Sequence, residues 1–234
     1  MQDRQDWDAS GEPPDPDVDA PGHDAIVTFA VFFEGGLAPL SLLLGWWFGH
    51  PPLRRFEWSG RAALLGAAAA ILPALGFLAI LRHPVGPLRR IKRFCEEEFV
   101  PLLGNSSWAD LVLIAISAGV GEEMLFRGVF QPAISAATGD VWGVILSSLL
   151  FGALHPISIP YAVVSFAMGL YLGATVLLTE NLLVAIVCHG VYDFLLMAYL
   201  LRPGDPVRPV GNPIGAIEAD RRIDGHDIDE HDAP

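Results

Sequence analysis

The stretch Gly121-Glu122-Glu123-Met124-Leu125-Phe126-Arg127-Gly128 places two carboxylates and an arginine inside an apolar run that extends from about residue 108 to residue 130. A charged side chain inside a bilayer costs roughly 2.5–3.5 kcal/mol on insertion scales, so three such groups together must pair, face a wet cavity or do chemistry. On a helix, Glu123 and Arg127 are four residues apart and lie on one face, where they can pair. Glu122 projects about 100° away from Glu123 and therefore needs a different partner.

Composition separates an apolar middle from two acidic ends. Of the 234 residues, 52% are hydrophobic, and the formal net charge is -13. The acidic side chains concentrate in residues 1–24 and 203–234, which are also rich in Pro or Gly. We therefore expect disordered acidic tails at both ends. We expect the bilayer as a partner and no nucleic acid.

Apolar runs long enough to cross a bilayer need about 20 residues. Six candidate spans satisfy or approach this length, at residues 26–48, 62–81, 108–130, 141–154, 161–178 and 182–201. Pro73 is expected to kink the second span. Gly169 and Gly173 give the fifth span a GxxxG spacing that favours close helix packing. The sequence thus predicts an all-α, polytopic transmembrane helix bundle with about six spans.

The segments between the spans suggest a division of the chain into four parts. They are a tail at 1–24, two amino-terminal transmembrane helices with an interfacial segment at 25–105, a helix core at 106–202, and a tail at 203–234. Residues 131–140 read as a connection after the third span. The distribution of Lys and Arg favours both tails and the 82–105 segment on the cytoplasmic side. Arg54, Arg55 and Arg61 lie in the opposing loop and run against this bias.

Two histidines inside the apolar block are candidate partners for Glu122. His155 ends the fourth span, and His189 lies in the sixth with Asp193 four residues later on the same helix face. Glu122 is about eight residues from the end of its span, and His189 about seven residues into its own, so the two lie at roughly the same depth of 12 Å. His155 comes out several ångströms deeper on this count. We expect the four side chains to meet around one water pocket.

Such a set of side chains supports peptide-bond hydrolysis. A buried carboxylate can act as general base toward water, with an imidazole orienting the same water molecule. A second histidine with its acidic neighbour can stabilise the developing oxyanion. A zinc ion held by two histidines and one or two carboxylates is the alternative, and the spacing does not choose between the two.

Other kinds of membrane protease, a membrane carrier and an inactive scaffold are the competing functions. The sequence contains neither HExxH nor GxSG, the motifs of two other kinds of membrane protease. Tyr192-Asp193 is similar to one aspartyl-protease motif, but its partner motif would need Asp where Glu122 stands. A proton- or cation-coupled membrane carrier would use the same buried groups to bind ions. A catalytically inactive membrane scaffold that binds a partner is the third alternative.

Three motifs in order carry a family resemblance: Glu122-Glu123-x-x-x-Arg127, Phe151-x-x-x-His155 and His189-x-x-x-Asp193. Together they resemble the CAAX protease and bacteriocin-processing (CPBP, or Abi) family, which includes the CAAX prenyl endopeptidases. The resemblance covers about residues 106–200. It implies an all-helical intramembrane protease in which Glu123 and Arg127 are supporting residues.

The resemblance also assigns roles to the other four motif residues. Glu122 and His155 would activate the water, and His189 and Asp193 would form the oxyanion-binding side, unless Asp193 instead orients His189. The resemblance allows two mechanisms, that of a metalloendopeptidase with zinc as cofactor and a metal-free glutamate mechanism. The implied substrate is a peptide or membrane protein, and the implied location is the bacterial cytoplasmic (inner) membrane.

Overall fold

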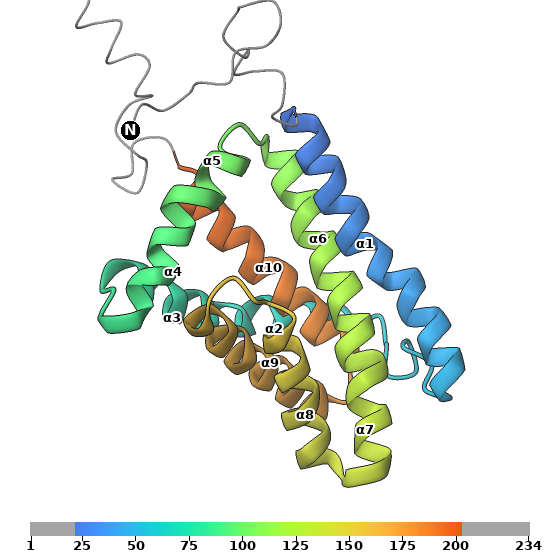
Figure 1. The fold of residues 1–234 in the computed structure, drawn as a ribbon. Coiled ribbons are helices and arrows are strands. Elements are labelled where there is room, and N and C mark those ends of the chain that lie inside the picture. Colours follow the sequence, from blue (N-terminus) through green and yellow to red (C-terminus); the bar gives the residue numbers. More distant parts are fainter. Residues whose placement is uncertain (1–21, 203–234) are drawn as a thin grey trace, which may run out of the picture.

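A computed structural model describes residues 22–202, and its elements are all helices (Figure 1). In chain order they are α1 (His23–Phe48), α2 (Gly60–Ala69), α3 (Ile71–Arg82), η1 (Gly86–Leu88), α4 (Arg89–Phe94), η2 (Cys95–Phe99), α5 (Val100–Leu103), α6 (Trp108–Leu125), η3 (Phe126–Phe130), α7 (Gln131–Thr138), α8 (Asp140–Ala153), α9 (Ile159–Thr179) and α10 (Leu182–Leu200). The described residues contain no strand, which confirms the all-α class. The predicted tails lie outside the described residues, except that α1 already begins at His23.

All six predicted spans are helical, but they are unequal in length. Four helical segments are long and apolar enough to cross a membrane: His23–Phe48, Gly60–Arg82, Ile159–Thr179 and Leu182–Leu200. A fifth span is obtained if Gly86–Leu103 and Trp108–Thr138, which are bent by 117°, count as one broken span. Helix α8 is apolar but only 14 residues long. The protein is therefore a polytopic membrane bundle, with four or five full-length spans in its described part.

The second span is interrupted at Ala70, between α2 and α3. Pro73 explains the break, because proline has no N–H to donate to the carbonyl four residues earlier, which belongs to Ala69. The Tyr171 hydroxyl donates to that carbonyl at 2.8 Å, so the free backbone acceptor is satisfied from α9. The predicted effect of Pro73 is confirmed, with the interruption one turn before the proline.

The third span extends further than the sequence predicts. Ser107 caps its start, because its side chain accepts a hydrogen bond from the Asp110 N–H and the Asp110 carboxylate accepts one in return. The helix then continues through the π-helical turn η3 into α7, so residues 131–138 are helical and not a connection. The wider π-helical turn comes directly before Pro132, whose ring nitrogen has no N–H to donate to the preceding turn.

Helix α6 lies between α1 and α10, and glycines allow both approaches (Figure 1). A Cβ on Gly121 would collide with the Glu34 carbonyl oxygen of α1. A Cβ on Gly119 would meet the Ile186 carbonyl oxygen of α10 at 2.8 Å. The two charged residues that follow are thereby held at the centre of the bundle.

Close packing also joins α8 to α9. A Cβ on Gly169 would lie 2.9 Å from the Ser148 Cβ, and one on Gly173 would lie 3.1 Å from a Val144 methyl group. The GxxxG spacing thus serves the close packing expected from the sequence.

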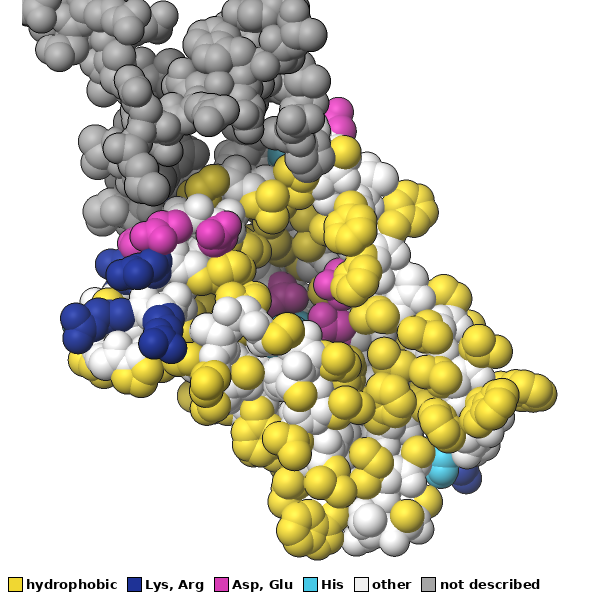
Figure 2. Space-filling view, viewed as in Figure 1, with side chains coloured by type: hydrophobic (Ala, Val, Ile, Leu, Met, Phe, Trp, Pro, Cys, Tyr) yellow, Lys and Arg dark blue, Asp and Glu magenta, His cyan; other side chains and the backbone are white. Residues whose placement is uncertain are grey.

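The segment predicted to be interfacial folds into the short helices η1 to α5. Two surface ion pairs at i,i+4 spacing support it, Lys92–Glu96 at 3.4 Å and Arg93–Glu97 at 3.7 Å. Figure 2 shows basic and acidic side chains gathered over this part of the molecule, beside a largely apolar surface. Cys95, inside the segment, and Cys188 of α10 are both buried free thiols.

Candidate active site

The four residues predicted to converge all line one cavity of about 420 Å³. Glu122 comes from α6, His155 from the turn after α8, and His189 and Asp193 from α10. Acidic side chains are visible at the bottom of a hollow in an otherwise apolar face (Figure 2). Elements far apart in the sequence therefore build a single polar pocket in the membrane bundle.

The innermost part of the site is a fully buried ion pair. Arg127 Nη1 donates to Glu123 Oε1 at 2.7 Å, and the two side chains are 1% and 0% exposed. Arg127 Nη2 also donates to the Gly169 carbonyl at 3.1 Å, which ties the pair to α9. The pairing predicted from the four-residue spacing is confirmed. Removing either partner would leave an uncompensated buried charge.

His189 connects the ion pair to the cavity. Its Nδ1 lies 2.8 Å from Glu123 Oε1, and because an ionised carboxylate only accepts, the imidazole is the donor. Its Nε2 lies 3.4 Å from Asp193 Oδ2 and 4.0 Å from Glu122 Oε2. Glu123 therefore fixes the orientation of the ring, and the other nitrogen is directed toward the two cavity carboxylates.

Glu122 is buried, and one of its two carboxylate oxygens is left free of structural contacts in the described part of the chain. Its Oε2 has no hydrogen-bond partner among the described residues, although its burial would normally require one. Arg127 is paired with the neighbouring Glu123 instead. Glu122 is thus an acceptor that faces the cavity and is near an imidazole, as its rotation of about 100° from Glu123 predicts.

His155 belongs to the same cavity but makes its own contacts. Its Nδ1 lies 2.7 Å from the Phe151 carbonyl oxygen, which can only accept, so Nδ1 carries the proton. In the neutral ring Nε2 is then the acceptor. The Phe151 ring lies 4.6 Å from His155 and 6.1 Å from His189, measured between centroids. Within residues 22–202, no hydrogen bond or ion pair links His155 directly to Glu122.

Glu34 and Tyr161 are among the polar residues of the cavity that sequence analysis did not select. Glu34 of α1 lines it, and the Glu34 Oε2 is buried without a hydrogen-bond partner in the described part of the chain. Tyr161, at the start of α9, lines it beside His155, with ring centroids 6.1 Å apart. The signal for Glu34 was present, because it is an acidic residue in an apolar run. Nothing in the sequence distinguishes Tyr161 from an interfacial aromatic.

A metal ion would need several donor side chains that converge on one point. Among the described residues, no group of three or more His, Cys, Asp or Glu side chains is placed to hold one. The Glu122 and His189 atoms that face each other are 4.0 Å apart. As they are arranged, the described side chains do not present the three or four convergent donors of a zinc centre.

The fold and site define an integral membrane protein of the helical class, with a carboxylate–imidazole centre inside the bundle. Residues 104–195 match the family model described as type II CAAX prenyl endopeptidase Rce1-like. The match confirms the resemblance predicted from the three motifs, and it covers the segment that carries them. Because this is a protease family, the match supports an intramembrane protease.

The two other comparisons add no relative. No curated protein and no solved structure matches the chain. The first two spans, including the Glu34 side chain that lines the cavity, lie outside the matched segment.

Proposed function

We propose that this protein is an endopeptidase that hydrolyses a peptide bond within the membrane, using a water molecule activated by Glu122 and His155. The observation that carries the proposal is the shared cavity, in which these two residues meet His189 and Asp193. A proton- or cation-coupled carrier would use the same side chains, but it would not account for the match to a protease family. An inactive scaffold would keep the fold, but it would have no use for a buried carboxylate oxygen without a partner among the described residues.

The first step of the proposed reaction is attack by water on the carbonyl carbon. Glu122 Oε2, which has no partner in the described protein, accepts the proton from the water as the C–O bond forms. His155 Nε2, an acceptor because Nδ1 donates to Phe151, orients the same water. The product of this step is a tetrahedral intermediate with a negatively charged oxygen.

The second step stabilises this oxygen and expels the amine. In its imidazolium form, with a proton on each ring nitrogen, His189 donates from Nε2–H to the oxyanion, while the bond from Nδ1–H to Glu123 holds the ring in place. Asp193, 3.4 Å from the same nitrogen, orients the imidazole. The C–N bond then breaks, and Glu122 returns its proton to the leaving amine. These steps need only the side chains of the chain, whose described His, Cys, Asp and Glu donors do not converge as a zinc site requires.

The walls of the cavity indicate the kind of substrate. Apart from the polar centre they are mainly apolar and aromatic side chains, including Phe29, Phe33, Phe77 and Phe99. An extended segment with apolar side chains fits such walls, so we propose a membrane-associated peptide or protein as substrate. The bacterial cytoplasmic membrane stays a prediction of the family resemblance.

The test is proteolysis by the purified full chain in nanodiscs. Quenched fluorescent peptides with an apolar segment would be incubated with the wild type and with Glu122→Gln, and the products mapped by mass spectrometry. We expect cleavage by the wild type and a fall of about 10²–10⁴-fold in the variant. Equal cleavage by both proteins, or none by the wild type with pH-driven ion uptake, would refute the proposal.

A further inference from the structure

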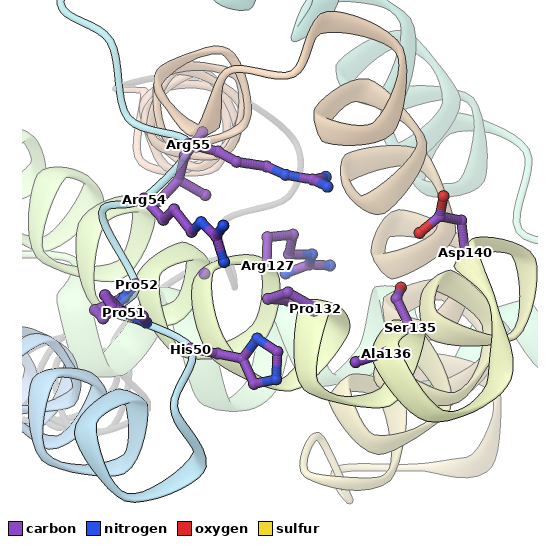
Figure 3. Close-up of a pocket in the computed structure, with 12 residues that line it drawn as sticks. His50, Pro51, Pro52, Arg54, Arg55, Arg127, Pro132, Ser135, Ala136 and Asp140 are labelled. Carbon is purple, nitrogen blue, oxygen red and sulfur yellow. The ribbon is translucent and has the colours of Figure 1, made fainter.

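A second cavity, of about 430 Å³, lies away from the candidate active site (Figure 3). Its walls come from the α1–α2 loop, the η3–α7 region, and the first residues of α8 and α10. The lining residues are His50, Pro51, Pro52, Arg54, Arg55, Arg127, Gly128, Pro132, Ser135, Ala136, Asp140 and Leu182. The two cavities share no lining residue within the described ranges. The proposed peptidase does not use this second space.

Basic side chains dominate the mouth of the second cavity. Arg54 and Arg55 are exposed, extend into the opening in Figure 3, and form no ion pair with a described residue. Arg127 lies deeper and is already neutralised by Glu123. Asp140 is the one carboxylate among the lining residues, across the opening from both arginines. Two uncompensated guanidinium groups against one carboxylate favour an anion that offers several oxygen acceptors.

The loop that carries the arginines is held in place. The Leu182 N–H donates to the Arg55 carbonyl at 2.7 Å. The Asn181 side chain donates to the Glu57 carbonyl at 2.9 Å and accepts from the Glu57 N–H at 3.2 Å. A Cβ on Gly128 would lie 2.7 Å from the Pro52 carbonyl oxygen, so the loop also packs tightly on η3. Such a loop positions the two arginines without the entropy cost of ordering its backbone on binding.

The surroundings place this cavity at a membrane–water boundary. Trp46 and Trp47 precede the loop and Trp58 lies near its end; the three are 77%, 75% and 79% exposed. Exposed tryptophans at the ends of spans mark the headgroup level of a bilayer. Basic pockets between membrane helices at this level bind phosphate-bearing headgroups.

We propose that Arg54 and Arg55 form a binding site for the phosphate group of an anionic phospholipid, with the headgroup in the cavity of Figure 3. The assignment also gives a reason for the arginines that oppose the charge bias of the other loops. A soluble phosphate ester shares this chemistry, but the flanking tryptophans favour the lipid. The proposal does not depend on the peptidase activity.

The test compares the full chain in nanodiscs of phosphatidylcholine alone and in nanodiscs that also contain phosphatidylglycerol. The readouts are Tm and the number of phosphatidylglycerol molecules retained in native mass spectrometry. We expect phosphatidylglycerol to raise the Tm of the wild type and to be retained. The double variant Arg54→Gln/Arg55→Gln should lose roughly tenfold in apparent affinity for this lipid.

Arg61→Gln is the matched control, because Arg61 is an exposed arginine of the same end of the bundle that does not line the cavity. It should bind phosphatidylglycerol like the wild type. In phosphatidylcholine all three proteins should share one Tm, which shows that the variants fold. An equal loss in Arg61→Gln, or no loss in the double variant, would overturn the proposal. Full competition by soluble glycerophosphate would also overturn it, in favour of a free phosphate ester.

Discussion

Glu123 Oε1 of α6 accepts a hydrogen bond from His189 Nδ1 of α10, and the two atoms are 2.8 Å apart. The same oxygen accepts from Arg127 at 2.7 Å. Glu123 therefore joins α6 to α10 and fixes the imidazole, while its neighbour Glu122 is left facing the cavity. Two adjacent acids of identical chemistry acquire different tasks because the helix turns by about 100° between them.

The first prediction concerns Asp193, which lies 3.4 Å from His189 Nε2. If Asp193 orients the imidazole, an asparagine oxygen can accept the same contact, so Asp193→Asn should keep cleavage within about tenfold of the wild type. Asp193→Ala removes the acceptor and should lower kcat by about 10–100-fold. Steady-state kinetics on the fluorescent peptides measure both. Equal loss in the two variants would instead point to a role that needs the negative charge.

The second prediction concerns the stability of the buried ion pair. Arg127→Ala leaves Glu123 without its guanidinium partner and should lower the free energy of unfolding by about 3–5 kcal/mol. Arg93→Ala is the matched control, because the Arg93–Glu97 pair is 74% and 65% exposed and should contribute at most about 1 kcal/mol. Denaturant titration in detergent measures both. Similar effects from the two substitutions would contradict the structural role of Arg127.

The third prediction concerns the contact of α1 with α6. A Cβ on Gly121 would collide with the Glu34 carbonyl, so Gly121→Ala should destabilise the fold by about 1–3 kcal/mol and reduce cleavage. Gly36→Ala is the control, because nothing lies within 4 Å of its added Cβ. It should be neutral or stabilising by up to about 1 kcal/mol, since alanine favours a helix over glycine. A harmless Gly121→Ala would show that the two helices separate easily.

The fourth prediction concerns metal dependence. The described His, Cys, Asp and Glu side chains form no group suited to a metal ion, so a chelator should leave the rate of peptide cleavage unchanged. The measurement is cleavage before and after dialysis against chelator, with metal analysis of the purified protein. Loss of activity that added zinc restores would require a rearranged site and a metallopeptidase mechanism.

Local chemistry allowed much of this arrangement to be predicted. The Glu123–Arg127 pair followed from helical spacing, and the helical character of the six spans followed from apolar runs bounded by polar residues. The extension of α6 through Pro132 was missed, because a π-helical turn depends on packing that no local pattern encodes. The bond between His189 and Glu123 was also missed, since the relative rotation of α6 and α10 is set by glycines at their crossing.

The position of Glu34 in the wall of the proposed catalytic cavity has a further consequence for how such chains diversify. The matched domain supplies three motifs, yet the chamber is closed on one side by a helix from outside that domain. Exchanging α1 between relatives should therefore change which polypeptides enter the cavity, while the residues proposed to hydrolyse the peptide bond stay the same.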